Sequence, residues 1–216
     1  NVHTTPLIGW GRFVKRGMDI AGSLIGLILS SPFWVIIAIA VKISDPRSKV
    51  FYKQSRLSRF NKTVGIYKFR THNATYHGLS PEEAFTKMGK PELIKTYREN
   101  GDKLENDPRI TRIGRFLRIT SLDELPQLLN VLRGDISLVG PRALVPFELE
   151  NYEFKSLILS VKSGLTGLAQ ISGRSDISFE ERRKLDMYYV QNWSFWLDTK
   201  IILQTIYMVI SGRGAR

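Results

Sequence analysis

Two adjacent carboxylates, Asp123 and Glu124, are the residues of this sequence best suited to chemistry. Pro126 has no backbone N–H, so it fits only in the first turn of a helix, and this places the helix start close to both acids. The helix dipole and the guanidinium groups of Arg115 and Arg118 would favour the ionised forms. An ionised, partly dehydrated carboxylate is a competent nucleophile at phosphorus and a hard ligand for magnesium.

The same two acids also have a purely structural interpretation. An aspartate at a helix N-terminus and a Ser-x-x-Glu spacing before an apolar run are ordinary capping chemistry. Nearby cations favour the chemical interpretation. Arg118 lies just upstream, and Gly140-Pro141-Arg142 follows a short apolar run, residues 136–139, that is typical of a strand leading into a turn.

More positive charge comes from residues 49–71, where apolar and basic residues alternate around an Asn61-Lys62 turn. This pattern predicts a hairpin or short strands with a cationic face. Lys68 and Arg70 flank Phe69 near the end of this stretch, so their cations could converge on the carboxylates. Such a face could equally be a solvated surface or a strip lying on anionic lipid headgroups. Cations gathered around ionised acids suit a phosphate ester held with a divalent metal.

Several common chemical sites are missing from the sequence. The three histidines, His3, His72 and His77, lack metal-ligand spacing and are interpreted as loop residues. There are no cysteines, which excludes disulfides, thiolate zinc sites and a cysteine nucleophile. Neither G-x-x-x-x-G-K-[ST] nor G-x-G-x-x-G occurs, so phosphate would have to be held by side chains, helix ends and metal.

An uncharged apolar segment, residues 20–41, is long enough to cross a bilayer as one helix. Pro32 lies near its middle and predicts a kink, where Ser30 and Ser31 can bond the freed backbone groups. Basic residues flank both ends, and basic flanks favour the cytoplasmic side. We therefore expect a re-entrant membrane hairpin kinked at Ser31-Pro32. A kinked membrane span and a buried core helix are the alternatives.

Further helices are marked by their caps. Ser80-Pro81-Glu82-Glu83 opens an expected solvent-facing helical insert, and Ser178-Phe179-Glu180-Glu181 opens another helix. The aromatic, apolar run 193–210 either closes the core or lies in the membrane interface. We expect a helix-rich mixed α+β fold with a small β element and amphipathic interfacial helices. Its membrane segment is 1–45, and a cytosol-facing catalytic domain, 46–216, forms one functional unit with it.

The composition supports one sizeable core with a strongly cationic surface. The chain has 216 residues, of which 43% are hydrophobic, and a formal net charge of +12. This charge indicates a polyanionic partner, which could be nucleic acid, anionic lipid or a phosphate-bearing substrate. Besides an enzyme, two other classes fit these residues: a nucleic-acid-binding module using residues 49–70, and an inactive scaffold subunit.

The motifs resemble those of a known family, the bacterial sugar transferases, also called monotopic phosphoglycosyl transferases. The resemblance rests on the apolar segment with its central Ser-Pro and on four stretches: YKFRT, DPRITRIGRFLRITSLDELPQLLNVLRGDISLVGPR, GLTGLAQISGR and YYVQNWSFWLDTKII. It covers nearly everything from residue 15 to residue 212.

The resemblance implies an activity. Such enzymes move a phosphosugar from a UDP-sugar to polyprenyl (undecaprenyl) phosphate, the first membrane step of surface glycan or exopolysaccharide synthesis. It also implies monotopic attachment to the cytoplasmic face of the bacterial inner membrane, with anionic phospholipid as a partner, and no nucleic acid. A homo-oligomer and a longer parent chain with an N-terminal membrane domain are both compatible with it.

Roles for individual residues follow from the same resemblance. Asp123 would be the nucleophile that expels UMP, with Mg²⁺ bridging it to the diphosphate, and Glu124 would be its partner in catalysis. Pro141-Arg142 and Arg118 match the phosphate-binding residues of the family. Lys68 and Arg70 match its basic cluster more loosely.

One position departs from the family pattern. The family usually reads Pro-Arg-Pro, whereas Ala143 follows Pro141-Arg142 here. Loss of the second proline relaxes the turn by ~1 kcal/mol of backbone entropy at most, so we expect Arg142 to be less rigidly aimed. The identity of the sugar is not readable from these motifs.

Overall fold

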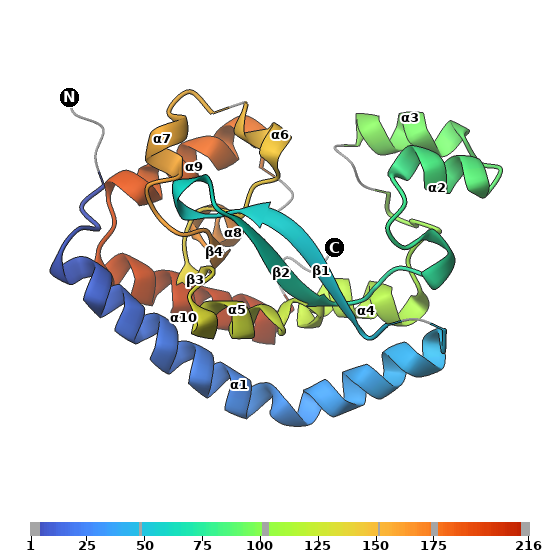
Figure 1. The fold of residues 1–216 in the computed structure, drawn as a ribbon, viewed down its shortest axis with the longest axis horizontal. Coiled ribbons are helices and arrows are strands. Elements are labelled where there is room, and N and C mark those ends of the chain that lie inside the picture. The colour runs from blue at the N-terminus through green and yellow to red at the C-terminus, as the bar shows by residue number, and fades with distance from the viewer. Residues whose placement is uncertain (1–4, 48, 101–103, 151, 174–176, 213–216) are drawn as a thin grey trace.

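The computed structural model describes residues 5–47, 49–100, 104–150, 152–173 and 177–212 (Figure 1). The helices are α1 (Trp10–Ser44), α2 (Pro81–Lys87), α3 (Glu92–Glu99), α4 (Arg112–Thr120), α5 (Gln127–Arg133), α6 (Pro146–Leu149), α7 (Lys155–Ile158), α8 (Leu168–Ile171), α9 (Phe179–Gln191) and α10 (Phe195–Ser211). The strands are β1 (Phe51–Leu57), β2 (Thr63–Phe69), β3 (Ser137–Val139) and β4 (Gly164–Thr166). This confirms a helix-rich mixed fold with small sheets.

The long apolar segment is one continuous helix, α1, which contains Pro32 and extends over 35 residues. Figure 1 shows its ribbon bowed, with both ends turned toward the rest of the chain. Pro32 cannot donate to the carbonyl of Ile28, and the hydroxyl of Ser31 donates to that oxygen instead, at 2.8 Å. The predicted hydrogen bond from a serine to the carbonyl freed by the proline is therefore present. The re-entrant path through a membrane stays a prediction.

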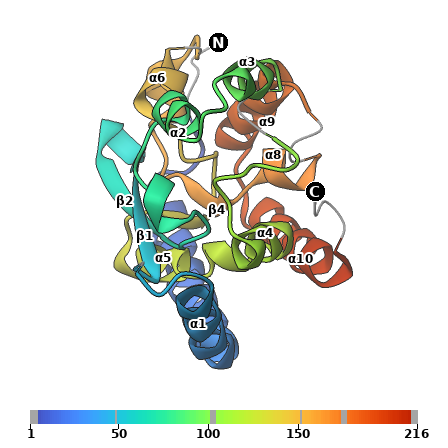
Figure 2. The ribbon, with the colours of Figure 1, turned by 90° about the vertical axis from the view of Figure 1, so that its right-hand side faces the viewer.

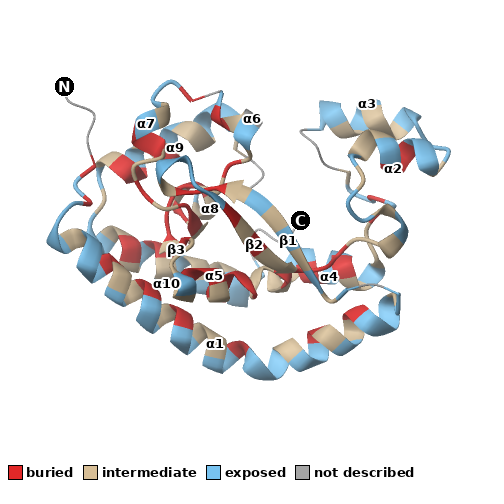
Figure 3. Ribbon diagram, in the orientation of Figure 1, coloured by how far each residue is buried: buried red, intermediate tan, exposed pale blue. Residues whose placement is uncertain are grey.

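Most of α1 is exposed on the side that faces away from the chain (Figure 3). Within the described residues, α1 is the one helix long and apolar enough to cross a membrane, and 11% of its most apolar window is buried. A core helix would be mostly buried. Ile28 and Leu29, each 70% exposed, lie near the bend. The core-helix alternative is therefore wrong, whereas hairpin and span both remain.

The basic stretch 49–71 folds as the predicted hairpin. β1 and β2 pair antiparallel, from Phe51 opposite Phe69 to Leu57 opposite Thr63. The turn lies at Arg59–Asn61, close to the predicted position, and both Phe60 and Asn61 have positive φ angles. The apolar run before Gly140 forms β3, which pairs parallel with β4.

Two hydrophobic clusters pack the rest of the chain against α1 and α10. The larger one packs α9 and α10 against β3 and the loops around them; its most buried members are Val139, Val161, Tyr189, Val190 and Ile201. A smaller one, which we call the α1 cluster, consists of Ile37, Val41, Phe69 and Leu117, with Trp34, Val50, Ile113, Leu122 and Leu125 packed against it.

Both predicted capping boxes are present, Ser80 with Glu83 on α2 and Ser178 with Glu181 on α9. The insert α2–α3 stands away from α1 in Figure 1, and α4 lies near the C-terminal end of α1 in the views of Figures 1 and 2. Helix α10 buries Ile201 in the core and exposes Trp196 at 77%. It thus packs on the core with one face and leaves an aromatic, apolar face open.

Candidate functional site

The two carboxylates lie in a short connection between α4 and α5. Helix α4 ends at Ser121, which has a left-handed conformation (φ 59°), and a 3-10 turn, Leu122–Glu124, follows. Pro126 is the N-cap of α5. The prediction that this helix begins close to the acids is confirmed, although they occupy the 3-10 turn and not the first turn of α5. Leu122 and Leu125 on either side of the acids pack against the α1 cluster.

Lys68 joins the carboxylates from β2. Its Nζ lies 2.7 Å from Oε1 of Glu124, and both side chains are partly exposed. Asp123 is more deeply placed, with 8% of its surface exposed. The predicted convergence of this cation on the acid pair is therefore present in the geometry.

Burial raises the pKa of Asp123 to about 6, because desolvation penalises its charged form. Lys68 and Arg118 lower this pKa, and the charge of Glu124 raises it. The expectation that the surroundings favour ionisation is thus wrong for Asp123, since burial outweighs the cations. With a pKa of about 6 the group is still roughly nine-tenths ionised at pH 7, as a nucleophile requires.

The arginines predicted near the acids separate into two groups. The charge of Arg118 lowers the pKa of Asp123, and the Nε of Arg118 donates to the Thr71 hydroxyl at 3.0 Å. Arg115 bonds to the side chain of Asn106 at 2.9 Å. Arg70 is 4% exposed and lies 3.4 Å from Asp45 at the end of α1. It therefore ties β2 to α1, and its role in substrate binding stays a prediction.

Pro141 and Arg142 lie in a turn beside β4. The Pro141 carbonyl accepts the Gly164 N–H at 2.8 Å, and the Arg142 N–H donates to Asp186 at 3.4 Å. A Cβ on Gly164 would lie 2.2 Å from the nitrogen of Gly140, so this close approach needs glycine. Ala143 packs against a small core cluster beside this turn. The expected loosening of Arg142 stays a prediction.

Arg56 is a residue that the sequence analysis did not single out. Its Nη1 lies 3.7 Å from Oε2 of Glu148, and 16% of its side chain is exposed. Burial and the charge of Arg142 lower its pKa, and the charges of Glu148, Tyr52 and Glu124 raise it. Arg56 therefore lies within electrostatic reach of both Glu124 and Arg142. The alternation of exposed and half-buried residues along β1 was the available signal.

The described residues contain no group of three or more His, Cys, Asp or Glu that could hold a metal ion. A magnesium ion would find Asp123 and Glu124 as hard oxygen donors, and magnesium commonly completes its shell with water and substrate phosphates. His72 has its pKa lowered to about 4 by burial and by Arg118 and Arg109, so it is neutral. His3 lies outside the described residues.

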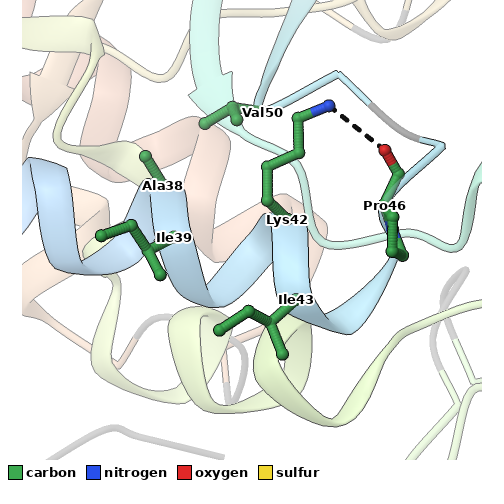
Figure 4. A pocket seen from close by; sticks show the side chains of 6 residues that line it. All are labelled: Ala38, Ile39, Lys42, Ile43, Pro46 and Val50. Atoms are coloured by element: carbon green, nitrogen blue, oxygen red, sulfur yellow. Dashed lines mark hydrogen bonds between the residues drawn. The ribbon is translucent and has the colours of Figure 1, made fainter.

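An apolar hollow at the C-terminal end of α1 lies apart from this chemistry. It is lined by Ala38, Ile39, Lys42, Ile43, Pro46 and Val50 (Figure 4). At the edge of this hollow, the Lys42 ammonium donates to the carbonyl of Pro46 at 3.3 Å. Val50 also accepts the N–H of Arg70 and packs against the α1 cluster, so the hollow adjoins the layer beneath the acids.

Fold and site together define a helix-rich domain with one membrane-length helix and an acid pair flanked by cations. Residues 10–212 match the family model described as bacterial sugar transferase. The chain belongs to the bacterial sugar transferase family.

Relatives at substantial identity carry informative names. The undecaprenyl-phosphate galactose phosphotransferase of Salmonella typhimurium is 42% identical over 205 residues, covering 94% of this chain and 42% of the relative. The exopolysaccharide production protein ExoY of Rhizobium meliloti is 42% identical over 206 residues, covering 95% and 89%. The UDP-glucose:undecaprenyl-phosphate glucose-1-phosphate transferase of Escherichia coli is 37% identical over 223 residues, covering 99% and 44%. The chain thus spans under half of two of these relatives.

Proposed function

We propose that this chain is a membrane-associated phosphoglycosyl transferase that moves a phosphosugar from a UDP-sugar to polyprenyl phosphate. The observation that carries this proposal is the placement of Asp123: it is buried, near Lys68 and Arg118, and its neighbours in the chain pack against α1. The family and the names of its members favour this activity over nucleic-acid binding and over an inactive scaffold.

In the first step, an oxygen of Asp123 attacks the phosphorus next to the sugar. The bond from that phosphorus to the bridging oxygen breaks, and UMP leaves with the electron pair. The product is a phosphosugar joined to the Asp123 carboxylate. Lys68 and Arg118 oppose the effect of burial, so they keep the nucleophile charged and offset the charge of the phosphates.

In the second step, a phosphate oxygen of the polyprenyl acceptor attacks the same phosphorus. The bond to Asp123 breaks, the carboxylate is restored and a lipid diphosphosugar forms. We assign to Glu124, whose carboxylate lies 2.7 Å from Lys68, the role of accepting a proton from the incoming acceptor. Dividing the transfer into two steps lets a soluble and a lipid substrate use one site in turn.

Magnesium belongs to this proposal as the cofactor. Asp123 and Glu124 would hold it, and when bound it would offset the negative charge of the diphosphate. A bound cation beside Asp123 would also counter the effect of burial on the pKa of that carboxyl.

For the membrane, we propose that α1 enters one leaflet as a hairpin and returns to the cytoplasmic face. The bowed ribbon of α1, its exposed apolar side and the basic residues at both of its ends support this path. The open face of α10, with Trp196 and Tyr207, would lie in the interface of the same membrane. Anionic phospholipid would then meet the net charge of +12.

The test is to trap the intermediate. We expect the wild type, incubated with UDP-galactose or UDP-glucose and Mg²⁺, to gain the mass of a phosphosugar on the peptide that contains Asp123. Asp123→Asn should show no adduct and no UMP release, because an amide is a poor nucleophile. Glu92→Gln, a charge change on an exposed residue of α3, should behave as the wild type. An adduct on another residue, or full turnover by Asp123→Asn, would remove the assignment.

A further inference from the structure

A second group of cations lies around the Pro141-Arg142 turn, at the C-terminal end of β1. The Leu57 N–H donates to the carbonyl of Leu144 at 2.8 Å, so the end of β1 lies directly against this turn. Arg56 precedes Leu57 and reaches Glu148 at 3.7 Å. One strand thus brings one arginine to the segment that contains Arg142.

Helix α9 holds the other side of the same turn. Asp186 on α9 is fully buried, and it accepts the Arg142 N–H through Oδ1 and the Tyr152 hydroxyl through Oδ2, each at 3.4 Å. Arg182 lies one helical turn before Asp186, and residues four apart share one face of a helix. Arg182 is therefore presented to the turn from α9, as Arg56 is from β1.

Arg142 lies within electrostatic reach of both Arg56 and Arg182. Burial is the main effect that lowers the pKa of both Arg56 and Arg182, and repulsion from Arg142 lowers each pKa further. Glu148 acts on both arginines, Glu124 acts on Arg56 and Asp186 acts on Arg182. Burial raises the pKa of Asp186 to about 7, so this group carries only part of a negative charge at neutral pH.

Like charges held together at partly buried positions attract an anion. Guanidinium groups bind phosphate through paired, charge-assisted hydrogen bonds, and several of them around one phosphate are a recurrent arrangement. Glu124 also acts on Arg56, so the cluster is continuous with the acid pair. Tyr52 pairs with Lys68, and Arg56 lies four residues further along β1, ~13 Å at the spacing of a strand. The length of an arginine side chain covers part of that distance.

We propose that Arg56, Arg142 and Arg182 form a second anion site, which holds the nucleotide-side phosphate of the UDP-sugar and retains UMP after it leaves. This inference rests on the proposed function. Beyond that function, it gives Arg56 and Arg182 a role in binding phosphate. It also makes Asp186 a positioning residue, which holds the turn through the Arg142 N–H. In Figure 1, β1 runs away from the C-terminal end of α1, so the turn beside its last residues lies apart from that end of the helix.

Binding of UMP tests the site without any turnover. We expect Arg56→Gln and Arg182→Gln each to weaken UMP binding about tenfold or more, since each removes charge-assisted hydrogen bonds to phosphate. The matched controls are Lys53→Gln on the exposed face of β1 and Lys184→Gln on the exposed face of α9. Both controls remove one positive charge and should leave the affinity for UMP within about twofold of the wild type.

A parallel measurement uses undecaprenyl phosphate in nanodiscs, because a lipid phosphate could occupy the same cations. The affinity for this lipid should be unchanged in Arg56→Gln and Arg182→Gln. Loss of lipid affinity with normal UMP binding would overturn the proposal, as would unchanged UMP affinity in both variants. If the glutamine variants do not fold, Arg56→Lys and Arg182→Lys keep the charge but lose the paired geometry, and weaker UMP binding is still expected.

These experiments distinguish failure of the second anion site from failure of the proposed function. If the wild type binds UMP and the two variants do not, the anion site stands even where no UDP-sugar yields UMP. If the wild type forms the adduct on Asp123 while both variants keep the KM of the wild type for UDP-sugar, the proposed function stands and the second anion site is wrong.

Discussion

Asp123 is mostly charged at pH 7 although burial raises its pKa, so its ionisation lowers the stability of the folded chain. Its folded-state pKa of about 6 lies above its ordinary value of 3.8, so the folded chain binds the proton more tightly than the unfolded chain. Below about pH 4 the carboxyl of Asp123 is protonated in both states, and it does not lower the free energy of unfolding. As the pH rises from about 4 to 6, ionisation of the buried carboxyl progressively lowers the free energy of unfolding, and above that range the loss is complete.

The prediction at this scale is that Asp123→Asn abolishes adduct formation and yet raises the free energy of unfolding at pH 7 by about 1–3 kcal/mol. The gain should vanish near pH 4. Chemical unfolding in detergent micelles at both pH values measures it. A variant that is less stable than the wild type at pH 7 would instead support the capping interpretation, in which Asp123 serves only the start of α5.

At the scale of elements, α1 is fastened to the rest of the chain by a buried ion pair near its N-terminus. Lys15 donates to Asp198 of α10 at 2.6 Å and to the Tyr189 hydroxyl of α9 at 3.1 Å. Trp193 also donates to Asp198, at 3.0 Å. Lys15 and Asp198 are both buried, so removing one partner leaves an uncompensated charge.

We therefore expect Lys15→Met to lower the free energy of unfolding by about 3 kcal/mol. Adding Asp198→Asn should recover part of this loss, because the buried negative charge is then gone while a hydrogen-bond acceptor remains. Lys200→Met on the exposed part of α10 is the control. A loss of the same size in Lys200→Met, or a double variant with the summed cost of the two single ones, would show that the pair does not couple α1 to α10.

At the scale of the whole molecule, the apolar side of α1 and the open face of α10 are separated from the cations that surround the acid pair. The α1 cluster joins α1 to the turn that carries the acids, with Ile37 and Val41 from α1 and Leu122 and Leu125 from the turn. This arrangement would hold Asp123 close to lipid headgroups, where the phosphate of a polyprenyl carrier lies, while the Arg56 site stays accessible to a soluble nucleotide.

The proposed hairpin makes a prediction about topology. The chain has no cysteines, so Arg12→Cys and Lys49→Cys can be labelled without background. Both should react with a membrane-impermeant maleimide from the same side of inverted vesicles, together with Lys90→Cys in the exposed connection between α2 and α3. Labelling of residue 12 from the opposite side would mean that α1 spans the bilayer.

Local patterns in the sequence predicted the acids ahead of α5, the capping boxes of α2 and α9, the β1–β2 hairpin and the proline in α1, because each depends on residues a few positions apart. The family was predicted from motifs that extend over most of the chain. The folded structure was needed to show that burial raises the pKa of Asp123, and that Arg142 acts on Arg56. It also showed that, of the two cations predicted to approach the acids, Lys68 contacts Glu124 while Arg70 pairs with Asp45. Desolvation and charge pairing depend on which distant segments pack together, and no local pattern contains that information.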